Sequence, residues 1–181
     1  MTHEALVRKA VEWLRREYRC GIVLAEQSCM SGETPDVIAW KSKCRSVVVE
    51  CKISRADFLA DRAKPWRKDP AIALGCERLY LAPAGIIRPE ELPTKWGLLE
   101  WKGQSVRLKV KPARNSQRSP EGLMNEMNLL LASLRRVEVR IDPQTITEFL
   151  QWKNRMARYN GGVLPGGMAA EDAEENVHLT M

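Results

Sequence analysis

The sequence predicts an α/β (α+β) fold, in which an amphipathic helix precedes several short strands and further helices follow. Short apolar runs, each bounded by Gly, Pro or polar turn residues, are typical of strands. Longer segments with apolar residues at helical spacing lie before, between and after these runs. The length of 181 residues and the 44% share of hydrophobic residues suit one globular domain with appendages.

The first helix is expected over residues 2–19, with one apolar face and with Thr2 as its N-terminal cap. A strand over residues 21–26 and a loop over residues 27–34 should follow. After a central hairpin and a second helix, three more strands are expected at residues 77–82, 97–101 and 105–110. The last of these alternates apolar and basic residues, so it should be half buried with one basic face.

The central hairpin is the stretch around which these elements are arranged. Its two apolar runs cover residues 35–40 and 46–52 and are joined by a short polar break. If Trp40 pairs with Ser46, the two residue numbers of every pair in the hairpin add up to 86. The register is thereby fixed for the whole hairpin.

This register places Asp36 opposite Glu50, with their Cβ atoms ~5 Å apart. Lys52 projects from the same face as Glu50, because side chains alternate along a strand. Two carboxylates at so short a distance repel one another unless positive charge lies between them. A Mg²⁺ ion, which is usually held by one or two carboxylates, water and phosphate, would resolve the repulsion. The alternative is a surface hairpin in which Lys52 is simply paired with Glu50.

Two further acidic residues are candidates for the same site. Glu26 ends the first expected strand beside the start of the hairpin, and the alternative is an exposed residue at a strand end. Glu4 lies near the edge of the apolar arc of the first helix, and the alternative is a fraying helix end. Glu26 is preferred.

The charge of the chain predicts a polyanionic partner. The net charge is +6, and residues 161–181 contain four acidic residues and no Lys or Arg, so residues 1–160 carry +10. Such a body is typical of nucleic-acid binding, although a charge that only confers solubility is the alternative. The simplest expected partner is nucleic acid.

Two segments concentrate this basic charge. A helix capped by Ser54 is expected in the basic segment 53–68 beside the hairpin, with Pro65 ending or bending it. Residues 102–118 hold six basic residues and no acidic one. Trp66 could stack on a base or pack against the protein. The residues expected to contact DNA phosphates are Arg55, Lys64, Arg67, Lys68, Arg107 and Lys109.

The five cysteines are odd in number and have no Cys-x-x-Cys spacing, and the chain has only two histidines. A structural zinc site is therefore not expected, and the cysteines are interpreted as reduced residues of a cytoplasmic protein. No signal peptide and no apolar run near the ~20 residues of a membrane span are visible. No membrane partner is expected.

Three regions are expected: a core over residues 1–112, a helical extension over 113–160 and a disordered acidic tail over 161–181. Within the extension, helices should cover residues 121–136 and 142–159, with a short strand-like segment at 137–141 between them. These helices could pack on the core or form a homo-oligomer contact, and the sequence does not decide between the two.

The order of these elements and motifs resembles the PD-(D/E)XK nuclease superfamily, and most closely the MmcB-like DNA-repair proteins and related phage-encoded proteins. The resemblance extends over about residues 2–111. Its motifs here are Glu26, Pro35-Asp36-Val37, Glu50-Cys51-Lys52, Ser54-Arg55-Ala56-Asp57-Phe58-Leu59-Ala60-Asp61, Lys64 and Trp66. The family pattern has Lys directly before Trp, whereas Pro65 separates them here. Some superfamily members supply the first acid from the first helix, which would favour Glu4.

The resemblance implies a restriction-endonuclease-like core with a mixed central sheet flanked by helices. It also implies a DNA endonuclease that hydrolyses phosphodiester bonds with Mg²⁺ or Mn²⁺, in DNA repair, recombination or phage DNA metabolism. Asp36 and Glu50 would bind the metal together with the carbonyl of Cys51. Lys52 would position or help to deprotonate the attacking water, and Glu26 would complete the metal shell. The competing hypotheses are a non-catalytic DNA-binding module on the same fold and an assembly protein.

Overall fold

The computed structural model describes residues 2–29, 32–64, 67, 69, 71–116 and 118–140. The chain divides into two compact units, of which the first ends at Leu131 and the second begins at Ala132. The first unit contains the whole β-sheet, and the expected helix over 142–159 and the acidic tail lie outside the described residues.

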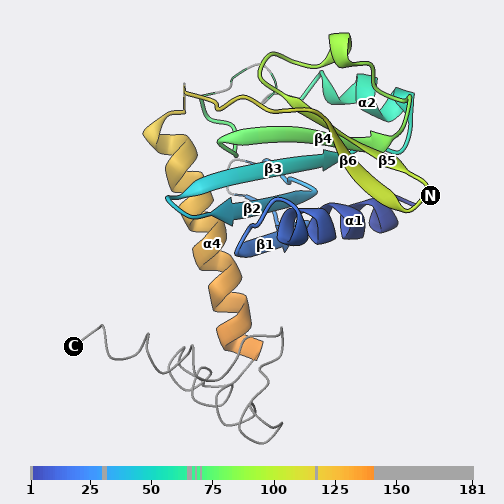
Figure 1. Cartoon of the computed structure of the whole chain (residues 1–181). Helices are drawn as coiled ribbons and strands as arrows, with labels where there is room; N and C mark the ends of the chain where they lie inside the picture. Colours follow the sequence, from blue (N-terminus) through green and yellow to red (C-terminus); the bar gives the residue numbers. More distant parts are fainter. Residues whose placement is uncertain are drawn as a thin grey trace, which may run out of the picture. The chain divides into compact units, whose positions relative to one another are not determined.

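The first unit is built on one mixed sheet of six strands in the order β1-β2-β3-β4-β5-β6 (Figure 1). The β3–β4 and β4–β5 pairs are parallel, and the other three pairs are antiparallel. The prediction of an α+β fold with helices beside a sheet is confirmed. The elements are α1 (His3–Arg16), β1 (Ile22–Ala25), β2 (Val37–Lys41), β3 (Arg45–Cys51), α2 (Arg55–Asp61), β4 (Glu77–Pro83), η1 (Pro89–Glu91), β5 (Gly97–Lys102), β6 (Ser105–Val110) and α4 (Pro120–Arg140).

Both N-terminal caps that the sequence predicts are present. The backbone N–H of Ala5 donates to Thr2 Oγ1 at 3.2 Å at the start of α1. The backbone N–H of Asp57 donates to Ser54 Oγ at 3.2 Å at the start of α2. These bonds satisfy N–H groups that have no partner within the helix.

Helix α2 ends at Asp61, four residues before Pro65, the residue predicted to end or bend it. Beyond it, the N–H of Ala63 donates to Ala60 O and the N–H of Lys64 donates to Asp61 O, each at 3.2 Å. These bonds span three residues instead of four, so they tighten and close the last turn.

The sheet has two buried faces of different composition. Helix α1 covers one face, where its apolar side chains pack on alternate residues of β2, β3, β4 and β5 (Figure 1). On the other face, Phe58 of α2 packs with Tyr80 of β4 and Trp96, and Leu129 of α4 packs with Ile38 and Val48. Both faces are formed by the same strands, because neighbouring side chains alternate across a sheet.

The start of α4 belongs to the core unit, which extends past the expected boundary at residue 112. Asn125, Glu126 and Leu129 are buried, and Gly122 lies so close to the backbone that a Cβ there would approach Ala71 O to 2.9 Å. The prediction of a strand-like segment at 137–141 is wrong for residues 137–140, because α4 continues through Arg140.

Two surfaces are more exposed than the sequence predicts. Leu108 of β6 is 41% exposed, so the edge strand is less buried than its alternation suggests. Leu123, Met124, Met127 and Leu131 of α4 are all exposed as well. The expectation of a homo-oligomer contact concerns this helix and stays a prediction.

Candidate functional site

The register of the hairpin is the one that the sequence predicts. Trp40 pairs with Ser46 and Val37 pairs with Val49, so the paired numbers add up to 86. Asp36 lies just before β2, and Glu50 lies near the end of β3. Continuing the observed pairing by one residue places the two carboxylates opposite each other.

Asp36 is held at this position by the backbone and by the start of α1. The N–H of Cys51 donates to its Oδ2 at 2.6 Å, and His3 Nε2 lies 3.4 Å from its Oδ1. Burial, and then the negative charge of Glu50, raise the pKa of Asp36. The repulsion between the two carboxylates that the register implies is therefore present in the structure.

Lys52 follows β3 and turns back over the same face of the sheet. Its Nζ lies 3.5 Å from Glu50 Oε2 and 3.0 Å from Asp61 Oδ1, and its side chain is 5% exposed. Burial opposes the ammonium form, but the charges of Glu50 and Asp61 outweigh it and raise the pKa of Lys52. Lys52 is therefore a buried cation held between two carboxylates.

Asp61, at the C-terminal end of α2, contacts several groups of this site at once. Its carboxylate accepts hydrogen bonds from Arg67 Nε at 2.6 Å and from the Tyr80 hydroxyl at 2.7 Å. Lys64 Nζ lies 3.0 Å from it, as Lys52 Nζ does. Burial alone would raise the pKa of Asp61, but Arg67 and Lys52 lower it well below its usual range.

Arg67 connects this group to a second buried ion pair. Its guanidinium lies 3.2 Å from Glu50 Oε1 and 3.8 Å from Glu33 Oε1. Glu33 also pairs with Arg78 of β4 and accepts the backbone N–H of Leu74 at 2.9 Å. Burial raises the pKa of Glu33 and lowers the pKa of Arg78, each against the charge of its partner.

An aromatic side chain supports both guanidinium groups. Trp96 stacks on Tyr80 with 4.4 Å between ring centroids, and the Arg67 and Arg78 guanidinium carbons lie 4.6 and 4.7 Å from its ring. Cation–π contacts of this kind stabilise charges that have lost water. The guanidinium groups are thus fixed by stacking as well as by ion pairs.

The charges of this group, which we call the buried ion cluster, balance. Its carboxylates are Glu33, Asp36, Glu50 and Asp61, and its cations are Lys52, Lys64, Arg67 and Arg78. Part of the positive charge that the sequence argument assigns to a metal ion is therefore supplied by the protein.

The sequence analysis did not single out Glu33, Asp61, Arg78 or His3 as site residues. A signal existed for Asp61, because Phe58 and Asp61 lie three residues apart on one face of a helix whose Phe should be buried. No sequence signal marks Glu33, which lies in a loop, because only the folded chain brings it to Arg78.

Neither candidate for the first acid brings its carboxylate into the site, although the backbone N–H of Glu26 donates to Asp36 O at 3.0 Å. Glu26 is exposed, with a left-handed backbone at φ 53°, and Glu4 is exposed and paired with Arg8 at 3.5 Å. Among the described residues, no hydrogen bond or ion pair links either side chain to Asp36, Glu50 or Lys52. From the first helix it is His3, rather than Glu4, that reaches Asp36.

The residues expected to contact DNA have different environments. The prediction that Arg67 contacts DNA is wrong, because its guanidinium is buried in the ion cluster and does not face solvent. Arg55 hydrogen bonds with Glu91, which lowers the pKa of that carboxyl to about 2. Arg107 and Lys109 of β6 are exposed, and Lys64 is half exposed. Lys68 and Trp66 lie outside the described residues.

Asp36 and Glu50 are the residues that could hold a divalent cation. Both Glu50 carboxylate oxygens are buried without a hydrogen bond, and their nearest cations are Arg67 at 3.2 Å and Lys52 at 3.5 Å. Across the described part of the chain, no group of three or more His, Cys, Asp or Glu side chains forms a metal site. Two carboxylates fit a Mg²⁺ or Mn²⁺ ion whose other ligands are water and substrate phosphate.

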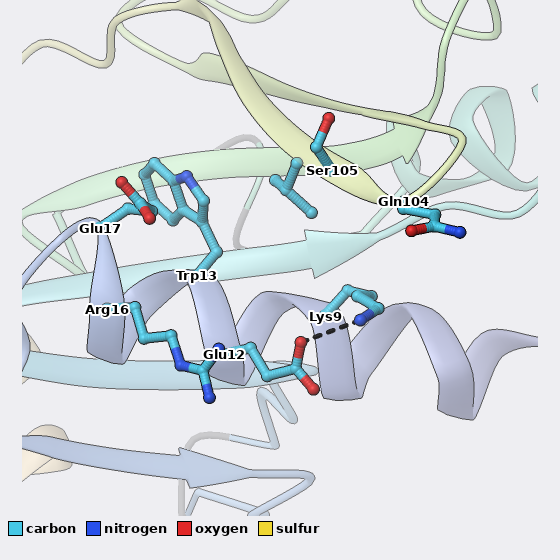
Figure 2. Close-up of a pocket in the computed structure, with 8 residues that line it drawn as sticks. Lys9, Glu12, Trp13, Arg16, Glu17, Gln104 and Ser105 are labelled. Atoms are coloured by element: carbon cyan, nitrogen blue, oxygen red, sulfur yellow. Dashed lines mark hydrogen bonds and ion pairs between the residues drawn. The ribbon is translucent and has the colours of Figure 1, made fainter.

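A hollow of about 180 Å³ lies away from this cluster, between α1 and the turn that joins β5 to β6 (Figure 2). Lys9 and Glu12 form an ion pair of 2.9 Å at its rim. Its lining residues are Lys9, Glu12, Trp13, Arg16, Glu17, Gln104, Ser105 and Val106. It shares no residue with the buried ion cluster, and its mixed charges indicate no particular ligand.

All five cysteines lie in described positions and are free thiols. Within the described residues, no helix combines the length and the apolar character that crossing a bilayer requires.

The chain matches no protein-family model and no curated protein. Its structure is similar to a solved structure described as SPO1766, a protein of unknown function from Silicibacter pomeroyi. The TM-score is 0.60 with 22% sequence identity, and the match covers 81% of this chain and 97% of that one. This similarity shows a shared fold and carries no function.

Proposed function

We propose that the protein is a metal-dependent DNA nuclease on a core of the PD-(D/E)XK type. The observation that carries this proposal is the hairpin register, which pairs Val37 with Val49 next to Asp36 and Glu50, together with the Lys52 ammonium 3.5 Å from Glu50. Two carboxylates and an amine at the end of a buried strand are the groups that phosphodiester hydrolysis with a divalent cation requires.

Some residues of the proposed site would bind the metal, and another would stabilise negative charge on the substrate. Asp36 and Glu50 would hold Mg²⁺ or Mn²⁺, which when bound polarises a phosphoryl oxygen and acidifies water. The N–H of Cys51 fixes the orientation of the Asp36 carboxylate. Lys52, held as an ammonium by Glu50 and Asp61, offsets negative charge on the phosphate and does not serve as the base.

DNA is the proposed substrate because of the charge of the chain. Residues 1–160 carry a net charge of +10, and Arg107 and Lys109 are exposed on the edge strand β6. DNA repair, recombination or phage DNA metabolism are the settings in which such a nuclease would act. Free thiols at all five cysteines favour the reducing environment of the cytoplasm.

A specific observation also favours the second candidate, a DNA-binding module without catalysis. The buried ion cluster is balanced by its own lysines and arginines, so its carboxylates are stabilised without a metal. A cluster of this kind can hold a core together and leave only the basic surface functional. The two candidates differ in cleavage and agree in binding.

The test is cleavage of labelled duplex, single-stranded and branched DNA with Mg²⁺, Mn²⁺ or EDTA. Asp36→Asn and Lys52→Met should each reduce the cleavage rate by about 10²–10³-fold, as expected for loss of a group that stabilises transition-state charge. Lys9→Met is the control, because Lys9 is also ion-paired, to Glu12 at 2.9 Å, but lies outside the cluster. Its cleavage rate should match that of the wild type.

DNA binding by fluorescence anisotropy separates the two candidates. Wild-type binding with no cleavage under any metal would replace the nuclease by the binding module. Arg107→Ala should weaken binding of all sequences and reduce the dependence of log Kd on log salt by about one phosphate contact. Absence of both binding and cleavage would contradict both candidates.

A further inference from the structure

Glu50 has an unusual set of neighbours for a carboxylate that is proposed to hold a metal. Its Oε1 lies 3.2 Å from Arg67, and its Oε2 lies 3.5 Å from Lys52 and 3.9 Å from Lys64. Neither oxygen makes a hydrogen bond with any of them. Glu50 is therefore neutralised by three protein cations without being bound tightly to any.

The three cations differ in how firmly they are fixed. The side chains of Lys52 and Arg67 are 5% and 4% exposed, and Arg67 also hydrogen bonds with Asp61 and stacks on Trp96. The Lys64 side chain is 39% exposed and contacts Asp61 at 3.0 Å from three residues away on the chain. Lys64 is thus the cation of the three that solvent, or a substrate, can reach.

The charge balance of the cluster sets a condition on metal binding. Among the described residues, four carboxylates already face four cations, so a divalent ion between Asp36 and Glu50 brings two surplus positive charges into a buried site. The repulsion falls if one protein cation moves away and if a phosphate enters. A lysine has a flexible four-carbon stem and donors that need no fixed geometry, so it can make that move.

We propose that Lys64 is an exchangeable counter-ion that couples metal binding to DNA binding, an inference that rests on the proposed function. Without metal, Lys64 neutralises Asp61 and Glu50. When the metal occupies Asp36 and Glu50, Lys64 turns to a phosphate of the substrate. Metal and DNA then strengthen each other's binding, and by linkage the two effects are equal.

The experiment measures binding and needs no catalytic activity. Mn²⁺ affinity is measured by electron paramagnetic resonance on the full chain without DNA. The affinity for a phosphorothioate duplex is then measured by anisotropy with and without Mn²⁺. Lys64→Met should bind Mn²⁺ about 3–10-fold more tightly than the wild type in the absence of DNA. It should also lose most of the enhancement of DNA binding by Mn²⁺, which is expected to be at least about 5-fold in the wild type.

Two variants serve as controls. Lys64→Arg keeps the positive charge and should stay near wild type in Mn²⁺ affinity. Lys9→Met removes a lysine of matched exposure, 38% against 39%, from an ion pair outside the cluster, and should change neither measurement. Thermal unfolding of each variant verifies the fold, and Lys64→Gln replaces Lys64→Met if the latter does not fold.

Two results would overturn the inference in different ways. If Lys64→Met binds Mn²⁺ as weakly as the wild type or more weakly, Lys64 does not compete for the carboxylates, and the metal site itself stands. If the wild type and all variants bind no Mn²⁺ with or without DNA, the proposed metal site fails and the coupling fails with it.

Discussion

The two faces of the sheet solve the problem of burial in opposite ways. The face under α1 is mostly apolar, and Leu6, Ala10 and Leu14 pack there on the valines of β2 and β3. Its buried carboxylate, Glu77 at the start of β4, is paired with Arg45. The other face buries Glu50, Asp61 and Arg78 among aromatic side chains. Strand β3 contributes to both, because Val47, Val49 and Cys51 alternate with Ser46, Val48 and Glu50 along it.

The difference indicates which face carries function. An apolar face stabilises the fold through burial alone, by about 25 cal/mol for each Å² removed from water. Buried ion pairs, by contrast, are often no more stabilising than apolar residues of the same volume, because desolvation offsets their attraction. The larger group of buried charges on one face is therefore explained better by chemistry than by stability.

The largest effect is expected from a change in the charged face. Asp61→Asn leaves Arg67 and Lys52 without the carboxylate that both contact, so the free energy of unfolding should fall by about 3–5 kcal/mol. Urea denaturation measures the change. A loss below about 1 kcal/mol would show that the remaining carboxylates compensate and would weaken the contrast between the faces.

A substitution in the apolar face should lower the free energy of unfolding by nearly as much, but for a different physical reason. Leu14 is fully buried, and Leu14→Ala should lower the free energy of unfolding by about 2–5 kcal/mol through lost burial and a cavity. The loss should be equal at pH 7 and at acidic pH, since no titrating group is involved. A loss that changed with pH would mean that the two faces are coupled.

The response to pH sharpens the comparison further. The pKa of Asp61 is lowered in the folded state, so the unfolded chain binds more protons and stability falls as the pH falls below ~3.9, the usual pKa of Asp. The difference in unfolding free energy between the wild type and Asp61→Asn should thus be full at pH 7. It should shrink by about 1.2 kcal/mol at pH 3, at 1.36 kcal/mol per unit below that pKa. A constant difference between pH 7 and pH 3 would contradict the assignment of the charge to Asp61.

The smallest effect is expected from the cap that starts α2. Ser54→Ala removes the acceptor of the Asp57 N–H and should cost about 1 kcal/mol of unfolding free energy. Ser42→Ala, in the exposed turn between β2 and β3, is the matched control and should change little. Equal losses in the two variants would mean that α2 does not depend on this cap.

Local patterns were sufficient for much of the fold. The caps at Thr2 and Ser54, the strand runs and the register of the hairpin follow from neighbouring residues, and the structure has them where they were expected. One error concerned α4, which continues through Arg140 although the sequence suggested a strand-like segment from residue 137. Helix α2 ends at Asp61, where its last turn tightens, before Pro65.

The sequence alone determined that Asp36 and Glu50 face each other and that Lys52 shares their face, because pairing in a hairpin depends only on the turn and on alternation. The tertiary structure decided which charges surround them. Glu33, Arg67 and Arg78 come from a loop, the segment after α2 and a strand that is parallel to β3. Local sequence patterns do not predict these contacts, because the interaction between two charges depends on their distance in the folded chain rather than on their separation along it.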